Sequence, residues 1–219
     1  MINALRHSSI YDPARYAHKR VALIGVGTIG SHLALTLARM QVPFTMYDPD
    51  TIEEHNLATQ AYTRRDLGRY KVEAIQAACE AIGAADGSIE AVPESFIQDS
   101  QSNIYAVVVS CVDSIEARRE IALQLEDYDN VMQVGNPAII DGRVGAEQVE
   151  VYRYANAAAW LTSLPEQADT DPCGARFTAY TANICAGLMA NAVKRELLGQ
   201  AVPARILYDA ASSSFIKTA

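Results

Sequence analysis

The sequence predicts an α/β protein with a Rossmann-like, mostly parallel sheet flanked by helices and with additional antiparallel strands in the C-terminal half. Three observations predict this fold. Residues 21–24 form a short apolar run that leads directly into a glycine-rich turn and a helical segment, as in a nucleotide-binding βαβ unit. Residues 105–112 form a second apolar run, which is typical of a fully buried central strand. Residues 143–152 alternate between faces, as antiparallel strands do.

The composition is that of an ordinary globular protein. With 219 residues, 50% of them hydrophobic and 20% charged, we expect an N-terminal arm at residues 1–19 and one domain at residues 20–219. The net charge of −8 argues against a nucleic-acid partner. No apolar stretch approaches the length of a membrane span, and the first residues lack a signal peptide's apolar core. We therefore expect a cytoplasmic protein without a membrane partner.

The glycine-rich turn has the spacing Gly25-X-Gly27-X-X-Gly30. Gly25 permits the tight turn, Gly27 lets a phosphate approach the backbone, and Gly30 allows close packing of helix on strand. The helix that follows presents free N–H groups to a phosphate. The next strand, residues 44–47, ends at Asp48, where a carboxylate can accept hydrogen bonds from ribose hydroxyls. Three glycines can also mark a turn packed for structural reasons, but this context favours nucleotide binding.

A long polar segment follows the second strand, and such segments are uncommon inside a compact domain unless they function. Its polar and basic residues are Asp50, Asn56, Gln60, Arg64, Arg65 and Lys71. Adenylation of a carboxylate needs cations at the α-phosphate and pyrophosphate, and acids that hold Mg²⁺. Lys71 and the pair Arg64 and Arg65 can supply the cations. The alternative is a solvated basic patch before the next helix.

Taken together, these motifs resemble the ThiF/MoeB/HesA family, the enzymes that activate ubiquitin-like proteins. The matching elements are Gly25/Gly27/Gly30, Asp48/Asp50, Asn56-Leu57 with Gln60, Gly68-Arg-Tyr-Lys71 and Cys111-Val-Asp113. The resemblance implies that these glycines, Asp48, Asp50, Asn56, Gln60 and Lys71 bind ATP. It also implies that Asp113 binds Mg²⁺ and helps to orient the attacking carboxylate.

Two residues depart from the family pattern. Thr59 stands where an arginine is expected, so a phosphate contact is missing unless Arg64 or Arg65 replaces it. Ser114 stands where an asparagine is expected, which keeps a hydrogen-bonding group. Both departures bear on the site more than on the fold.

Asp113 also has a structural interpretation, as the cap of a helix that begins at Ser114. On that helix Arg118 and Arg119 are expected to be surface or salt-bridge groups. Arg143 could meet a substrate tail, although a strand-edge arginine is the simpler interpretation.

In the second half, residues 131–136 are expected to form a strand, with turns at residues 135–137 and 141–142. Residues 155–172 are polar and irregular and match the family's crossover segment, which lies over the substrate tail. Residues 208–219 are expected to form a short closing strand or tail.

The four cysteines lack Cys-X-X-Cys spacing, so we expect no structural zinc. Cys79, Cys111 and Cys185 fall in apolar patterns and are expected to be buried. Cys173 lies in a loop before a helix, close to Arg176, where its pKa would fall. It is a candidate nucleophile that takes the activated acyl group, although a loop cysteine is often incidental.

The function that the sequence favours is ATP- and Mg²⁺-dependent adenylation of a partner protein's C-terminal carboxylate. The resemblance implies a small ubiquitin-like or sulfur-carrier partner that ends in Gly-Gly, and a homodimeric enzyme, in which Arg6 or Arg15 of the arm could reach the partner subunit. An NAD(P)-dependent oxidoreductase is one alternative. A non-catalytic scaffold of the same fold is another, and Thr59 is its best support.

Overall fold

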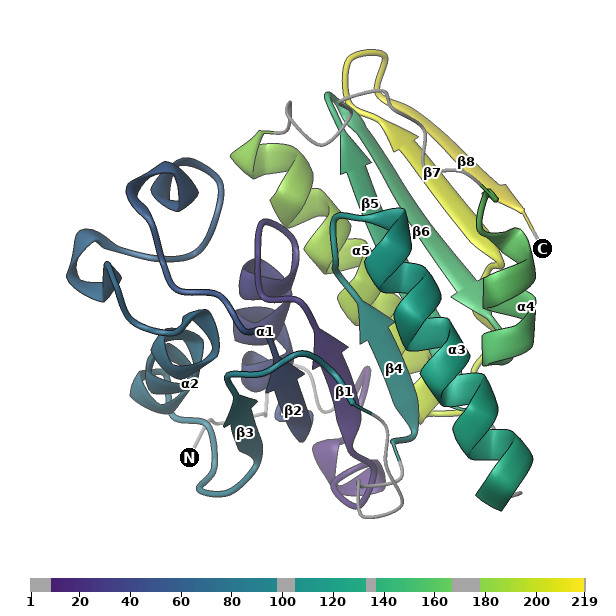
Figure 1. The fold of residues 1–219 in the computed structure, drawn as a ribbon, viewed down its shortest axis with the longest axis horizontal. Helices are drawn as coiled ribbons and strands as arrows, with labels where there is room; N and C mark the ends of the chain where they lie inside the picture. Colours follow the sequence, from purple (N-terminus) through teal and green to yellow (C-terminus); the bar gives the residue numbers. More distant parts are fainter. Residues whose placement is uncertain (1–8, 98–104, 133–136, 167–177, 219) are drawn as a thin grey trace.

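A single eight-stranded mixed sheet organises the protein (Figure 1). The computed structural model describes residues 9–97, 105–132, 137–166 and 178–218, and for residues 129–132 the backbone alone. The strand order is β3-β2-β1-β4-β5-β6-β7-β8. Neighbouring strands from β3 to β5 are parallel, and those from β5 to β8 are antiparallel. The predicted Rossmann-like parallel core with antiparallel C-terminal strands is therefore confirmed.

The element bounds follow the chain in a βαβ order through the first half. The strands are β1 (Val21–Ile24), β2 (Phe44–Tyr47), β3 (Ile89–Val92), β4 (Val107–Ser110), β5 (Ala138–Gly145), β6 (Gln148–Tyr154), β7 (Arg205–Asp209) and β8 (Ser214–Thr218). The helices are α1 (Gly30–Arg39), α2 (Lys71–Ala81), α3 (Ile115–Met132), α4 (Ala157–Ser163) and α5 (Ala179–Leu197). Short 3-10 helices are η1 (Pro13–Arg15), η2 (Glu54–Ala58) and η3 (Arg64–Asp66).

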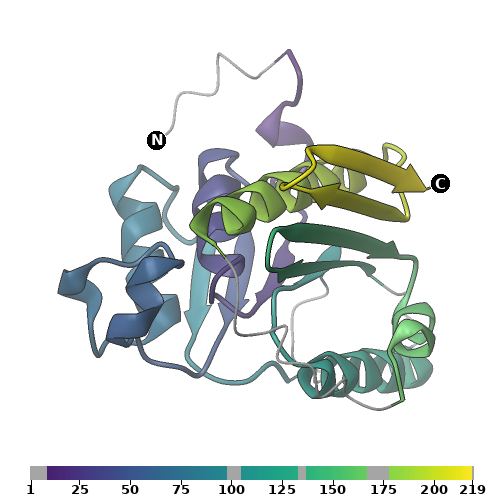
Figure 2. The same ribbon diagram turned by 90° about the horizontal axis from the view of Figure 1, so that it is seen from above.

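The sheet separates two apolar clusters. Helices α1, α2 and α5 cover one face, and α3 and α4 cover the other, as Figure 2 shows from above. All four residues of β1 and of β4 are buried, because both strands are covered on both faces. Consecutive residues of β4 therefore divide between the clusters, with Val108 in one and Val109 in the other. This continuous apolar pattern is what predicted the two central strands.

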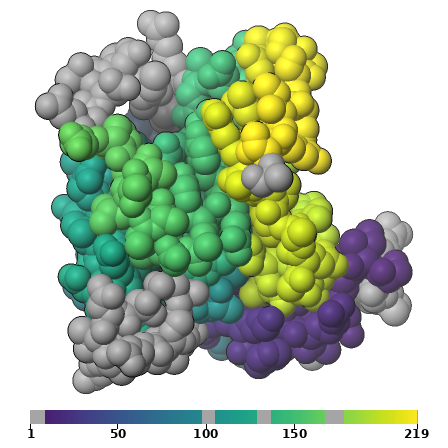
Figure 3. Space-filling model, turned by 90° about the vertical axis from the view of Figure 1, so that its right-hand side faces the viewer, coloured from purple at the N-terminus to yellow at the C-terminus, as the bar shows by residue number. Residues whose placement is uncertain are grey.

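Beyond β5 the sheet is more open. The last strand, β8, is exposed at every position and pairs with β7 alone among the described strands. Figure 3 shows this side of the molecule, where the C-terminal residues in yellow lie beside the green residues that precede them. The expected closing strand or tail at residues 208–219 is thus the second half of a hairpin that begins at Arg205.

Four predictions for the second half were wrong. The single strand expected at residues 143–152 is interrupted by a hairpin turn, because β5 ends at Gly145, Ala146 has φ of +51°, and β6 begins at Gln148. Residues 141–142 lie inside β5 and form no turn, because Asp141 is held there by Arg118 and Arg143 and Gly142 packs against α5. The strand expected at residues 131–136 is replaced at its start by the end of α3, and residues 133–136 lie outside the described part. The segment expected to be irregular contains α4, which is alanine-rich and capped by Asn156.

Candidate functional site

The glycine turn joins β1 to α1, and its three glycines have different roles. Gly25 has φ of +85°, which favours glycine. A Cβ atom on Gly30 would lie 1.9 Å from the carbonyl oxygen of Gly25, so α1 packs against the turn without room for a side chain. A Cβ on Gly27 would meet only the Gln60 side chain, at 4.0 Å. The backbone at Gly27 is therefore open to a ligand.

Asp48, at the end of β2, holds the glycine turn in place. Its Oδ2 accepts a hydrogen bond from the backbone N–H of Val26 at 2.8 Å, and its Oδ1 accepts one from Asp50 at 2.9 Å. The residue is only 6% exposed. Burial raises the pKa of Asp48 above its ordinary value, although the charge of Lys71 and these backbone bonds lower it. Each carboxylate oxygen keeps further capacity to accept a hydroxyl.

Lys71 lies beside Asp48, although the two are far apart in the chain. Its Nζ donates to Asp50 Oδ2 at 2.6 Å and lies 3.9 Å from Asp48 Oδ1. Its side chain is only 9% exposed. Backbone hydrogen bonds from Lys71 to Asp50 and from Ile52 to Arg69 join the two ends of the polar segment. The fold thus brings one buried cation and two carboxylates to the carboxyl end of β2.

The segment between these ends folds back over the glycine turn. Asn56 is buried, and its Oδ1 accepts the backbone N–H of Glu53 at 2.8 Å, which closes the first turn of η2. Gln60 follows, and its Nε2 is the atom that faces Gly27. Its Oε1 is buried and has no hydrogen-bond partner among the described residues. A ligand donor would satisfy this oxygen.

Sequence reasoning missed the side chains that fasten this segment to the turn. Tyr62 donates its hydroxyl to the carbonyl of Val26 at 2.5 Å. Ser31 accepts the backbone N–H of Ala61 at 3.0 Å, and His32 bonds the carbonyl of Thr59 at 3.0 Å. Thr59, which replaces the family's arginine, has its hydroxyl 3.4 Å from that of Thr28 in the turn. No local pattern in the sequence signals these contacts, since each joins residues about 30 positions apart.

The arginine pair lies away from these groups. Arg64 is 82% exposed, and its Nη2 lies 3.8 Å from Glu54 Oε1. Arg65 is also exposed. The structure therefore does not bring Arg64 to the glycine turn. The candidate nucleophile Cys173, together with Arg176, falls outside the described residues, as does Arg6.

Asp113 follows the end of β4 and is exposed at the same edge of the sheet. The cap of α3 is Ser114, whose Oγ accepts the backbone N–H of Ala117 at 3.0 Å. Asp113 is therefore not required as the cap. In parallel sheets ligands bind at the carboxyl ends of the strands, where Asp48 and Asp113 both lie.

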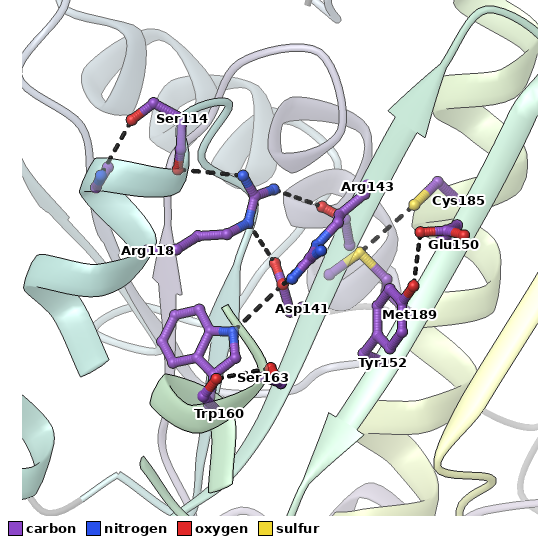
Figure 4. Close-up of polar contacts among 12 residues, drawn as sticks. Ser114, Arg118, Asp141, Arg143, Glu150, Tyr152, Trp160, Ser163, Cys185 and Met189 are labelled. Carbon is purple, nitrogen blue, oxygen red and sulfur yellow. Dashed lines mark hydrogen bonds and ion pairs between the residues drawn. The ribbon is translucent and has the colours of Figure 1, made fainter. Parts of the chain in front are cut away.

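A buried ionic cluster supports the turn after β4 (Figure 4). Asp141 of β5 is fully buried and accepts hydrogen bonds from Arg118 of α3 at 2.9 Å and from Arg143 at 2.7 Å. Trp160 of α4 also donates to this carboxylate, at 3.3 Å. Arg118 is thus a salt-bridge group as expected, but it is buried and not at the surface. In the sequence, the only indication of this ionic cluster was a charged residue, Asp141, that follows the apolar start of β5.

Three cysteines are described, and all are buried. Burial raises the pKa of Cys79 to about 12 and raises those of Cys111 and Cys185 as well. These thiols are therefore held protonated and are poor nucleophiles. Among the described residues, no three His, Cys, Asp or Glu side chains gather in a group that could hold a metal.

The polar groups around the glycine turn are of the types that bind a nucleotide with Mg²⁺. Gly27 leaves its backbone open, Gln60 has an unsatisfied oxygen, and Asp48 can accept ribose hydroxyls. Asp50 and Asp113 are exposed carboxylates, the ligand type that Mg²⁺ prefers when it is also held by phosphate and water.

The fold and these groups define a Rossmann-like protein with an open glycine turn and, at the carboxyl end of β2, a buried carboxylate beside a buried lysine. The chain belongs to the ThiF family, whose sequence profile matches residues 11–217.

Solved structures and a curated relative agree with this assignment. E. coli MccB with MccA-N7isoASN superposes with a TM-score of 0.72 at 17% identity, over 94% of this chain and 66% of that one. PaaA superposes with a TM-score of 0.68 at 18% identity, over 94% and 65%. The ATP-dependent ubiquitin transferase-like protein Cap2 of Vibrio cholerae is 32% identical over 124 residues, which are 53% of this chain and 21% of Cap2. The chain thus spans about two thirds of MccB and a fifth of Cap2 in these alignments. Its described helices are all too short or too polar to cross a membrane.

Proposed function

We propose that this protein uses ATP and Mg²⁺ to adenylate the C-terminal carboxylate of a peptide or small protein, with release of pyrophosphate. The observation that carries the proposal is the placement of Asp48, Lys71 and Asp113 at one edge of the sheet, around an open glycine turn. Membership of the ThiF family supports it. MccB, with which the chain shares its fold, has been solved with ATP and with MccA.

The chain's own residues have separate tasks in this reaction. Asp48 orients the ribose, and the turn at Gly27 and the buried cation of Lys71 receive the phosphates. Asp50 and Asp113 would hold Mg²⁺, which neutralises phosphate charge when it is bound. Asp113, which is exposed after β4, also helps to orient the attacking carboxylate, as the family resemblance implies. Catalysis then consists of positioning and charge stabilisation.

The substrate we propose, on the resemblance to the ThiF/MoeB/HesA family, is a small ubiquitin-like or sulfur-carrier protein that ends in Gly-Gly. The name of Cap2 supports a ubiquitin-like partner, whereas MccA in the MccB complexes supports a peptide. We further propose a homodimer in the cytoplasm and leave Cys173 as the candidate that takes the acyl group.

ATP–pyrophosphate exchange tests the proposal. Purified protein with Mg²⁺ is assayed with candidate carrier proteins that end in Gly-Gly and with the same proteins lacking that ending. Exchange that requires the intact C-terminus is the expected result. Tight binding of NAD(P) with hydride transfer would establish the oxidoreductase instead, and absence of ATP binding would favour the scaffold that Thr59 suggests.

A further inference from the structure

The ionic cluster under the turn after β4 carries a surplus of positive charge. Two guanidinium groups, those of Arg118 and Arg143, share the single carboxylate of Asp141. That carboxylate is fully buried, and the side chain of Arg118 is only 5% exposed. These three groups carry two positive charges and one negative charge, and Glu150, the cross-strand neighbour of Arg143 on β6, is itself paired with Arg205.

The two arginines use their donors differently. Arg118 donates a hydrogen bond from each of its three guanidinium nitrogens: to Asp141, to the carbonyl of Ser114 and to the carbonyl of Gly142. Arg143 directs Nε and Nη2 to Asp141 Oδ2, at 2.9 and 2.7 Å. Its Nη1 has no hydrogen-bond partner among the described residues. The side chain of Arg143 is 25% exposed, so the positive charge of this residue is accessible at the surface.

Arg143 is also held rigidly. Its guanidinium lies 4.8 Å from the ring centroid of Tyr152, and two N–H groups that donate to the same oxygen of Asp141 restrict its orientation. Burial alone would lower the pKa of Arg143, but Asp141 raises it above its ordinary value, so the charge is permanent. A fixed guanidinium with one free edge is suited to bind a carboxylate or carbonyl oxygen.

The position of Arg143 decides which substrate it meets. Strand β4 pairs with β5 at Ser110 and Asp141 and then ends, whereas β5 continues through Arg143. Arg143 therefore projects past the end of β4, and the bond from Arg118 to the carbonyl of Ser114 joins its cluster to the turn that carries Asp113 (Figure 4). The glycine turn follows β1, two strands and about 10 Å away from β5.

We propose that Arg143 is a specificity-determining residue that binds the oxygens of the substrate's C-terminal residues and guides the carboxylate toward Asp113. This inference rests on the proposed adenylation function. Asp141 and Tyr152 preorganise the guanidinium, so that little conformational entropy is lost when the substrate binds. The glycine turn that is proposed to receive the ATP phosphates follows β1, and β4 separates it from the strand that carries Arg143.

Steady-state exchange kinetics of Arg143→Gln test the inference, with Arg205→Gln as the matched control. Arg205 lies over the same Tyr152 ring, at 5.4 Å, but pairs with Glu150 on the more distant β7. The probe is the Gly-Gly carrier protein that supports exchange by the wild type. We expect Arg143→Gln to raise the KM for this carrier about tenfold or more and to leave the KM for ATP within about twofold. Arg205→Gln should change neither constant.

Arg143→Lys separates recognition from folding, because it keeps the charge and loses the guanidinium fork. It should give an intermediate KM for the carrier. Thermal unfolding identifies any variant that has lost its fold. If the wild type exchanges but Arg143→Gln and Arg205→Gln share one carrier KM, this inference is wrong and the adenylation function stands. If no Gly-Gly carrier supports exchange by the wild type, both this inference and the proposed Gly-Gly substrate are wrong.

Discussion

Substitution of glycine by alanine should have opposite effects on stability at two positions, Gly30 and Gly187. Gly30→Ala places a methyl group 1.9 Å from a backbone oxygen, so the glycine turn or α1 must shift. We expect a loss of about 1–3 kcal/mol in the free energy of unfolding and loss of ATP binding. Gly187→Ala, in α5, meets nothing within 4 Å and should gain up to about 1 kcal/mol. Urea unfolding of both variants measures the difference, and equal effects would contradict the packing described for Gly30.

Lys71 compensates two carboxylates, and its contribution to stability therefore depends on pH. Burial raises the pKa of Asp48 in the folded state. The contribution of Asp48 to stability is therefore greatest at a pH below its ordinary pKa, where the carboxyl is protonated in both the folded and the unfolded state. This contribution is lost as the pH rises through the raised pKa of the folded state. In Lys71→Met the ionised Asp48 has no cation beside it, so the variant loses more stability than the wild type over this range.

We expect Lys71→Met to lower the free energy of unfolding by about 2 kcal/mol at pH 7, and by less toward pH 4. Urea titrations across this range measure it. Lys217→Met, on the exposed strand β8, is the control and should change stability little at either pH. A Lys71→Met deficit that did not depend on pH would show that the ion pair contributes nothing.

The residues that sequence could place are those that belong to short, ordered motifs. Asp48 was predicted from its spacing after the glycine turn and Lys71 from the family resemblance, and the structure brings them to within 3.9 Å. Tyr62 and Asp141 were missed because their roles come from contacts between distant segments. Arg64 was a candidate on charge alone, and charge does not show whether a side chain turns toward a site or toward solvent.

At the scale of elements, two neighbouring residues at the start of α3 are expected to have different roles, one in stability and the other in activity. Ser114 caps the helix, whereas Asp113 makes no capping bond. Ser114→Ala should lower the free energy of unfolding by about 1 kcal/mol. Asp113→Ala should leave stability nearly unchanged and abolish pyrophosphate exchange. Unfolding and exchange measured on both variants test this, and a destabilised Asp113→Ala would assign the cap to Asp113 after all.

Strand β5 shows why turn chemistry misled the prediction. Asp-Gly is a common turn pair, but here Gly142 is needed because a Cβ atom would lie 2.2 Å from Met189 Sδ of α5. Asp141 is tolerated in the strand because two arginines and Trp160 satisfy its carboxylate. Tertiary packing thus overrode the local preference. The apolar runs of β1 and β4 were predicted correctly because complete burial leaves a continuous pattern.

At the scale of the whole molecule, ligand binding should stabilise the fold in a selective way. Mg²⁺ and ATP at about 100 times the dissociation constant should add about 2.7 kcal/mol and raise the melting temperature. NAD should give no such shift, because the proposed site uses the lysine and the carboxylates to bind a triphosphate and its metal. Thermal unfolding with each nucleotide measures this, and Lys71→Met should remove the ATP effect. A shift with NAD and none with ATP would favour the oxidoreductase.

The most direct test of carboxylate adenylation follows an oxygen atom. A carrier protein whose terminal carboxylate is labelled with ¹⁸O is incubated with ATP, Mg²⁺ and hydroxylamine, which cleaves the acyl-adenylate at its carbonyl carbon. Mass spectrometry should then find one labelled oxygen in AMP and none in pyrophosphate. Label in inorganic phosphate with formation of ADP, or no label in any nucleotide product, would contradict the account.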